Sequence, residues 1–206
     1  MNPQRAWSKT IIACAFSLGA MGLLLPSAAP AQAPKFFIKP VAEKRIKELP
    51  AGPLYWRLEN FPTLAQAQAA AGPTSLAAEV SGKVWLFTLG GKGGATPGAS
   101  KVIEIGPVPR VTAPEYLLRI NHAGGPPGAK TKVHSHPGSE SFYVLAGQLG
   151  QKTPNGVAHA ETGHAMVGHG PGMAMEVFSS GTTDLDQLVM FFVDPSKPFS
   201  SPAKLK

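Results

Sequence analysis

The stretch Gly128-Ala-Lys-Thr-Lys-Val-His134-Ser-His136-Pro-Gly-Ser-Glu140-Ser-Phe-Tyr-Val-Leu-Ala-Gly147 decides the fold of this 206-residue chain. Alternate residues of a β-strand point to the same face, so we expect His134 and His136 on one side of a strand, with Lys132 beside them. A Pro-Gly turn breaks that strand, and Glu140 begins the return strand. The sequence therefore predicts two imidazoles and one carboxylate facing a common interior.

Neutral imidazole and carboxylate ligands suit zinc, manganese, iron, nickel or copper, whereas calcium prefers oxygen ligands. Two histidines and one carboxylate with open positions is the arrangement that non-haem Fe(II) oxygenases use, and zinc hydrolases use a similar set. We expect a divalent transition metal on His134, His136 and Glu140, and the residues do not select among these metals. A residual polar pocket without metal is the alternative.

The spacing Gly-x5-His-x-His-x3-Glu-x6-Gly of this stretch resembles the first signature motif of the cupin superfamily, position for position. The chain looks like the small secreted single-domain bacterial cupins of unassigned function. The resemblance implies an all-β jelly-roll barrel, with the motif's metal ligands at His134, His136 and Glu140. It implies a metal-dependent oxygenase, isomerase or decarboxylase of a small molecule. The rivals are a non-catalytic small-molecule-binding cupin with a degenerate or absent metal site, and a metal-free protein-interaction domain.

The second cupin motif is incomplete in this chain. Its nearest match, Gly170–Ser179, places Met175 where the family has a fourth ligand histidine and Ser179 where it has an asparagine. Met175 could supply a soft thioether, which favours copper, or close the pocket as an apolar lid. His169 could replace the missing ligand. Lys132 could contact an anionic substrate, or its head could simply reach solvent at the mouth of the barrel.

Many short apolar segments separated by Gly, Pro and Asn turns predict an all-β sandwich or barrel. We expect the barrel over residues 73–195 and a C-terminal tail over 196–206. Residues 34–72 are expected to form an N-terminal arm with a short helix.

Three features are expected within that arm. Residues 41–49 could form two helical turns before Pro50, and 54–60 alternates like a half-buried strand. A helix is expected over 64–71, with Thr63 as its N-cap. Cupins often dimerise by packing sheets or exchanging an N-terminal strand, and Leu54 to Leu58 would suit that role in the homodimer that we expect.

The first 33 residues have the order of a secretory signal peptide, with Arg5 and Lys9 before the apolar run 11–25 and a small-x-small site at 31–33. The apolar run is shorter than the roughly 20 residues of a membrane-spanning helix. We therefore expect a periplasmic or secreted protein that has no membrane contact after cleavage. Cys14 is the only cysteine, so the mature chain would contain no disulfide.

The formal net charge of +7 comes from basic residues that are spread along the chain and are not interleaved with aromatic residues. This distribution argues against nucleic acid as a partner. The glycine-rich segment 90–100 lacks the following Gly-Lys-Ser/Thr of a phosphate-binding loop. A small-molecule ligand is the partner that the barrel motif favours.

Overall fold

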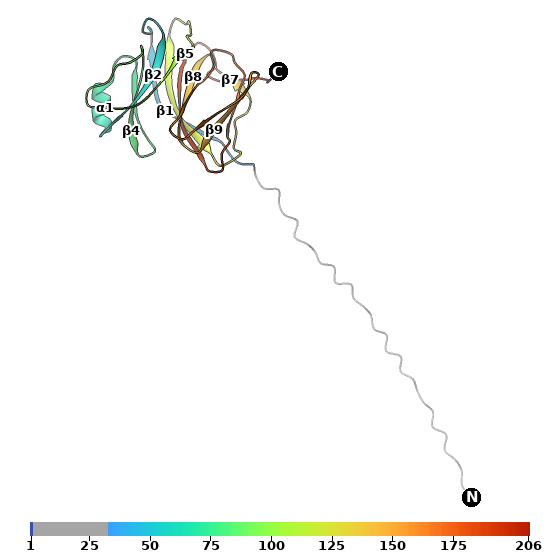
Figure 1. The fold of residues 1–206 in the computed structure, drawn as a ribbon. Coiled ribbons are helices and arrows are strands. Elements are labelled where there is room, and N and C mark those ends of the chain that lie inside the picture. Colours follow the sequence, from blue (N-terminus) through green and yellow to red (C-terminus); the bar gives the residue numbers. More distant parts are fainter. Residues whose placement is uncertain (2–32) are drawn as a thin grey trace. The chain divides into compact units, whose positions relative to one another are not determined.

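Antiparallel strands make up most of the computed structural model, which describes Met1 and residues 33–206 (Figure 1). The predicted signal peptide lies outside the described residues except at its first and last positions, Met1 and Ala33. The remainder, Ala33–Lys206, is one unit, and its all-β architecture confirms the predicted fold class. In the part of the chain that the structure describes, no helix is long and apolar enough to cross a membrane.

Two groups of strands form the walls of the barrel. A five-stranded sheet has the order β1-β6-β13-β8-β11, and it faces a three-stranded sheet, β10-β9-β12, and a short pair, β14-β7. A further four-stranded sheet, β3-β4-β2-β5, lies outside the barrel. The bounds are β1 (Phe37–Ile46), β2 (Leu54–Phe61), β3 (Ser75–Val80), β4 (Lys83–Gly90), β5 (Ser100–Val108), β6 (Tyr116–Gly125), β7 (His134–Ser135), β8 (Gly138–Ala146), β9 (Gln148–Thr153), β10 (Gly156–Glu161), β11 (Ala165–Val167), β12 (Glu176–Ser179), β13 (Leu185–Val193) and β14 (Ser201–Pro202).

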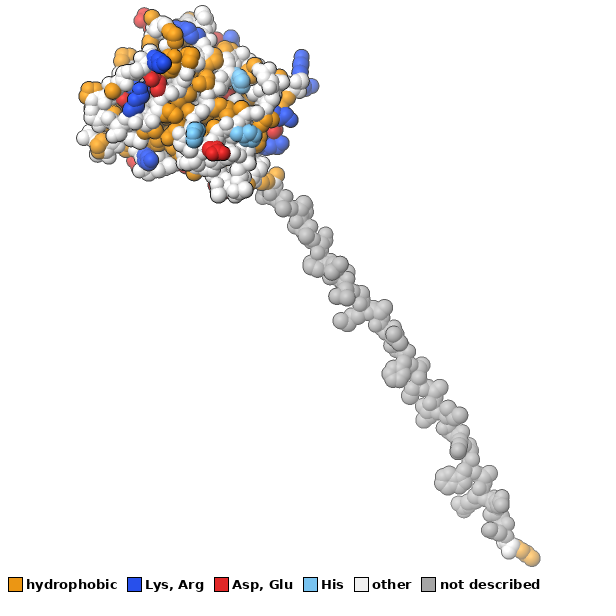
Figure 2. Space-filling model, in the orientation of Figure 1, with side chains coloured by type: hydrophobic (Ala, Val, Ile, Leu, Met, Phe, Trp, Pro, Cys, Tyr) orange, Lys and Arg blue, Asp and Glu red, His pale blue; other side chains and the backbone are white. Residues whose placement is uncertain are grey.

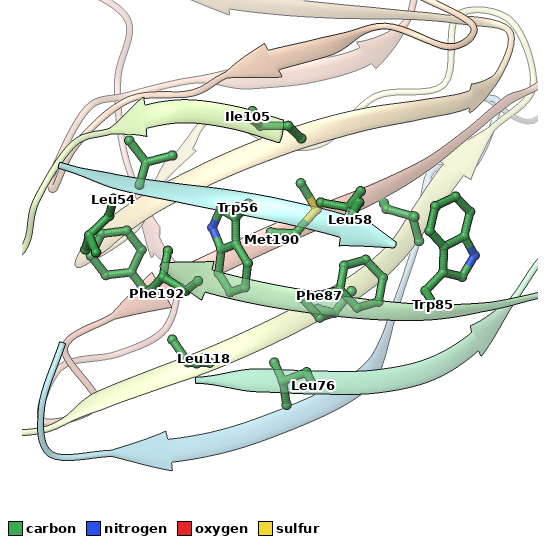
Figure 3. Close-up of a cluster of buried hydrophobic side chains, with 14 of the residues drawn as sticks. Leu54, Trp56, Leu58, Leu76, Trp85, Phe87, Ile105, Leu118, Met190 and Phe192 are labelled. Carbon is green, nitrogen blue, oxygen red and sulfur yellow. The ribbon is translucent and has the colours of Figure 1, made fainter. Parts of the chain in front are cut away.

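The four-stranded sheet covers the outer face of the five-stranded sheet. Trp56 and Phe87 from the former pack in one buried cluster with Leu118 and Phe192 from the latter (Figure 3). The strand predicted over 54–60 is β2. The alternate residues Leu54, Trp56 and Leu58 form its apolar face and are fully buried in this cluster. That strand lies between β4 and β5 of its own chain, so its apolar face and both its edges are occupied without a second subunit.

The prediction of helical turns over 41–49 is wrong, because β1 covers Phe37–Ile46. The strand pairs with β6 from Phe37 to Ile46, with an irregularity between Pro40 and Ala42. Its side chains face two ways: Ile38 and Pro40 line the pocket inside the barrel, as does Phe36 just before the strand. Val41, Ala42 and Ile46 pack on the outer core instead. Tertiary pairing of this kind outweighs a weak helix propensity.

The predicted short helix is confirmed as α1 (Leu64–Ala70). The Thr63 hydroxyl accepts a hydrogen bond from the backbone N–H of Gln66 at 3.3 Å, which satisfies one of the free donors of the first turn. Ala67 is buried against Phe61 and Leu86, so the helix docks on the four-stranded sheet.

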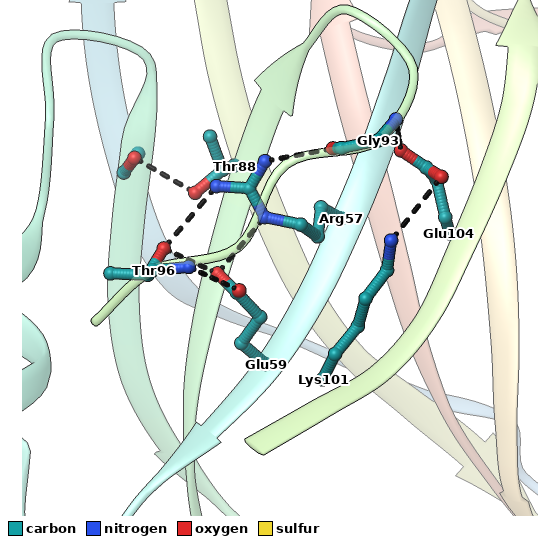
Figure 4. A network of polar contacts seen from close by, with 8 residues as sticks. Arg57, Glu59, Thr88, Gly93, Thr96, Lys101 and Glu104 are labelled. Carbon is teal, nitrogen blue, oxygen red and sulfur yellow. Dashed lines mark hydrogen bonds and ion pairs between the residues drawn. The ribbon is translucent and has the colours of Figure 1, made fainter. Parts of the chain in front are cut away.

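A polar network fixes the glycine-rich loop over 90–100 (Figure 4). Thr96 donates to the Glu59 carboxylate from its backbone N–H at 2.8 Å and from its hydroxyl at 2.6 Å, and Arg57 pairs with the same carboxylate at 3.1 Å. Burial raises the pKa of Glu59, but the bonds from Thr96 and the Arg57 charge outweigh it and hold that pKa below its ordinary value. The glycine-rich loop is thus held by side chains of β2, a structural role.

The segments predicted as an arm and a tail are both part of the fold. Residues 34–72 supply β1 to the barrel and β2 to the outer sheet. In the tail, Ser201 pairs with Ser135 and Pro202 with His134, so the chain returns across the motif. Figure 2 shows Lys and Arg side chains scattered over the visible face, with hydrophobic side chains between them.

Candidate ligand and metal site

The interior of the barrel contains a pocket of about 440 Å³, a size typical of small-molecule sites. Strands β1, β6, β7, β8, β12 and β13 contribute to it, and so does the C-terminal segment. Its lining is mostly apolar with a few polar side chains: Phe36, Ile38, Pro40, Arg119, Asn121, Ala123, Thr131, Lys132, His134, His136, Glu140, Phe142, Val177, Gln187, Val189, Phe191, Phe199 and Ser200.

All three predicted metal ligands line this pocket. The rings of His134 and His136 lie edge to face, with centroids 4.9 Å apart, and His136 Nε2 is 3.9 Å from Glu140 Oε2. Gly147 ends the motif with φ +74°, and a Cβ there would lie 2.4 Å from the Asp184 carbonyl oxygen. Only glycine fits that close turn, which then leads from β8 into β9.

Both histidines have one ring nitrogen bound to the backbone. Nδ1 of His134 is 2.8 Å from the Lys132 carbonyl oxygen, and Nδ1 of His136 is 2.6 Å from that of Phe199. A carbonyl oxygen only accepts, so Nδ1 carries the proton in each ring and Nε2 keeps its lone pair. This is the tautomer that metal-binding histidines adopt when a carbonyl orients them.

In the absence of metal, burial favours the uncharged forms of Glu140 and His136. Burial raises the pKa of Glu140 to about 8, although a hydrogen bond from Gln151 to its Oε1 at 2.9 Å opposes this. Burial also lowers the pKa of His136 to about 4. At neutral pH the metal-free site therefore holds a protonated carboxyl beside a neutral imidazole.

The second-motif residue Met175 lies next to the first motif. Its backbone exchanges two hydrogen bonds with His134, at 2.8 and 2.9 Å. The side chain is 2% exposed, and its Sδ is 3.5 Å from the Gln151 Nε2 that also binds Glu140. Met175 packs in the barrel's apolar cluster and does not line the pocket.

The two remaining candidate residues differ in their position relative to the pocket. Lys132 lines the pocket, while His169 is not part of its lining. Within residues 33–206, no group of three or more His, Cys, Asp or Glu side chains is arranged closely enough to hold a metal ion as it stands. The structure thus places the predicted ligands in one pocket without a ready-made three-ligand cluster.

The sequence prediction does not single out several pocket residues that bear on its chemistry, among them Arg119, Asn121, Gln187 and Phe199. The first three alternate with outer-core residues along β6 and β13, a period-2 signal that identifies a face but not its ligand. The Phe199 ring packs on His136 and carries the Arg119 guanidinium 4.0 Å above its centre. Its place beside the motif depends on the long-range β14-β7 pairing, which no local pattern indicates.

The facing antiparallel sheets and the motif at the pocket define a jelly-roll barrel of the cupin type. No family model matches the sequence, and no curated protein matches it significantly. Among solved structures, a cupin-like protein from Thermotoga maritima is 16% identical, with a TM-score of 0.38 over 43% of this chain and 65% of that chain.

Two further solved structures have similar parts. A cupin superfamily protein from Desulfitobacterium hafniense is 10% identical, with a TM-score of 0.34 over 37% of this chain and 68% of that one. The DMSP lyase DddQ from Ruegeria pomeroyi is 18% identical, with a TM-score of 0.37 over 42% and 43% of the two chains. The chain spans less than two thirds of the length of several such structures.

Proposed function

We propose that the protein binds a small molecule inside its barrel, next to a divalent transition metal held by His134, His136 and Glu140. The observation that carries the metal proposal is the pair of imidazole rings whose Nδ1 atoms donate to backbone carbonyls. Both Nε2 atoms are left as lone-pair donors, and one of them lies 3.9 Å from the Glu140 carboxyl. The donor set of two nitrogens and one oxygen suits transition metals.

The chain's own residues would prepare this site in defined ways. Gln151 fixes one oxygen of Glu140, and the Phe199 carbonyl fixes the ring of His136. Uptake of a cation would replace the Glu140 proton, since ligands bind metals in their deprotonated form. A bound metal would supply Lewis-acid chemistry or an oxygen-binding centre, as in an oxygenase, isomerase or decarboxylase.

The second candidate is a binding protein without metal. It is favoured by the lack of a ready-made group of three ligating side chains in residues 33–206 and by the buried methionine at position 175. Here the neutral pair of His136 and Glu140 would act as polar contacts at the wall of an apolar pocket. The pocket itself is common to both candidates.

Elemental analysis of protein purified without chelator or histidine tag tests the metal proposal. We expect about one transition metal per chain, and its loss in His134→Ala. His164→Ala is the matched control, because the Nδ1 of His164 lies 3.2 Å from a backbone carbonyl in the same way but outside the pocket. Folded wild-type protein that contains no metal and takes up none when it is added would refute the metal site and favour the second candidate.

The export proposal is separate from the site. We propose that the protein acts in the periplasm or outside the cell, as its N-terminal sequence indicates. Fractionation with detection of the mature N-terminus would test this, since a cytosolic chain that retains residues 1–33 contradicts it. A homodimer is likewise proposed, and sedimentation equilibrium would measure it.

A further inference from the structure

Two side-chain amides deep in the barrel lack hydrogen-bond partners and lie outside the candidate metal-ligand set. Asn121 is 3% exposed and Gln187 is 1% exposed. Among the described residues, Asn121 Oδ1 and both Oε1 and Nε2 of Gln187 have no partner. Both side chains line the pocket. Buried polar groups are nearly always hydrogen-bonded in folded proteins, so these three atoms point to a ligand.

The sheet register brings the two amides together. Asn121 on β6 pairs with Val189 on β13, and Gln187 on β13 pairs with Ala123 on β6. The amides are therefore diagonal neighbours on one face, about 7–8 Å apart between Cα atoms. The pocket lining around them includes four apolar side chains: Ala123, Phe142, Val177 and Val189.

We propose that Asn121 and Gln187 form a subsite for the carboxamide group of a small, otherwise apolar ligand. A primary carboxamide offers two N–H donors and one carbonyl acceptor. These match the two unpaired side-chain oxygens and the one unpaired NH₂ group. The inference rests on the proposed small-molecule function of the pocket and adds the chemical class of the ligand.

Two other ligand classes match less well. A carboxylate provides acceptors only, so it would leave the Asn121 and Gln187 oxygens unpaired and place its charge against them. The nearby cation on this face, Arg119, is paired with Glu43 through one Nη atom and stacked on Phe199, while its Nε has no partner among the described residues. A hydrocarbon would leave all three amide atoms without a partner. The subsite thus favours a neutral group that both donates and accepts.

Three probes of similar size test the proposal on protein treated with chelator: benzamide, benzoate and ethylbenzene, each titrated by calorimetry. We expect benzamide to bind at least tenfold more tightly than the other two. Gln187→Leu and Asn121→Leu should each weaken benzamide at least tenfold without weakening ethylbenzene. Gln68→Leu, on the exposed face of α1, is the matched control and should change nothing.

The possible results of these titrations distinguish failure of the carboxamide subsite from failure of the small-molecule pocket. Equal binding of the three probes, or benzamide binding that neither leucine variant changes, would overturn the carboxamide subsite and leave the small-molecule pocket standing. Failure of folded wild-type protein to bind any probe would overturn both. The comparison among probes needs no variant, so it decides the matter even where a variant does not fold, and the chelator keeps it independent of the metal.

Discussion

Replacing Gln187 with leucine should stabilise the ligand-free protein. The side chain is almost fully buried, and neither of its amide atoms has a partner in the described structure. A buried polar group left unpaired costs about 1–3 kcal/mol, and leucine has a similar size without that cost. We therefore expect the free energy of unfolding to rise by roughly 1–3 kcal/mol. In a domain of this size, each kcal/mol raises Tm by about 2–4 °C.

The contrasting variant is Gln151→Leu, which changes another buried glutamine of the same barrel. Gln151 is 2% exposed, but its amide donates to Glu140 Oε1 at 2.9 Å. Removing that donor leaves a buried carboxyl oxygen unpaired, so unfolding free energy should fall by about 1–3 kcal/mol. The two substitutions are chemically identical, and their predicted effects have opposite signs.

Urea unfolding followed by circular dichroism, on chelator-treated wild-type and variant proteins, measures both effects. A midpoint shift without a change in slope reports stability alone. Loss of stability in Gln187→Leu as large as in Gln151→Leu would refute the reasoning, since Gln187 would then be a structural hydrogen-bonding residue. A stabilised variant that also loses ligand binding would show that this position favours function over stability.

Three further predictions concern the network, the second motif and the C-terminus. Glu59→Ala should lower the free energy of unfolding by about 3–5 kcal/mol at neutral pH, because it leaves the largely buried Arg57 without its carboxylate partner. Since the folded pKa of Glu59 lies below its ordinary value of 4.5, the carboxylate's contribution is present above that pH and is lost in more acid solution. The urea midpoints of the wild type and of Glu59→Ala, measured between pH 3 and 7, should therefore approach each other as the pH falls. A difference between them that does not change with pH would contradict the network. Although Met175 does not line the pocket, its Sδ lies 3.5 Å from the Gln151 amide that binds Glu140. Met175→His should therefore raise metal affinity several-fold in competition with a chelator, and unchanged affinity would mean that position 175 cannot reach the metal. Ending the chain at Lys197 removes the carbonyl that orients His136, so metal affinity should fall about 10–100-fold, and an unchanged affinity would show that the return strand is dispensable.

Local patterns in the sequence predict most of the strands. Residues 148–153 and 165–167, for example, are short segments bounded by turn residues that form strands of the barrel, because alternation and turn residues act over short distances. The motif spacing likewise predicts that His134, His136 and Glu140 share one pocket. These features depend on neighbours in the chain, which the sequence displays directly.

The remainder depends on contacts between distant segments. The local sequence of residues 41–49 favours a charged helix. Pairing of β1 with β6, about 80 residues away, makes most of this segment a strand instead. The Phe199 carbonyl reaches His136 only through the β14-β7 pair. Asn121 and Gln187 become neighbours only through the register of β6 and β13, so their spacing in the sequence carries no sign of a shared site.

Anomalous X-ray diffraction from crystals of protein prepared without chelator, at the absorption edges of the metals found by elemental analysis, tests the central claim most directly. The account predicts one strong peak inside the barrel, within bonding distance of Nε2 of His134, Nε2 of His136 and the carboxylate of Glu140. A well-diffracting crystal with no peak at that position, or with a peak held by other residues, would contradict it.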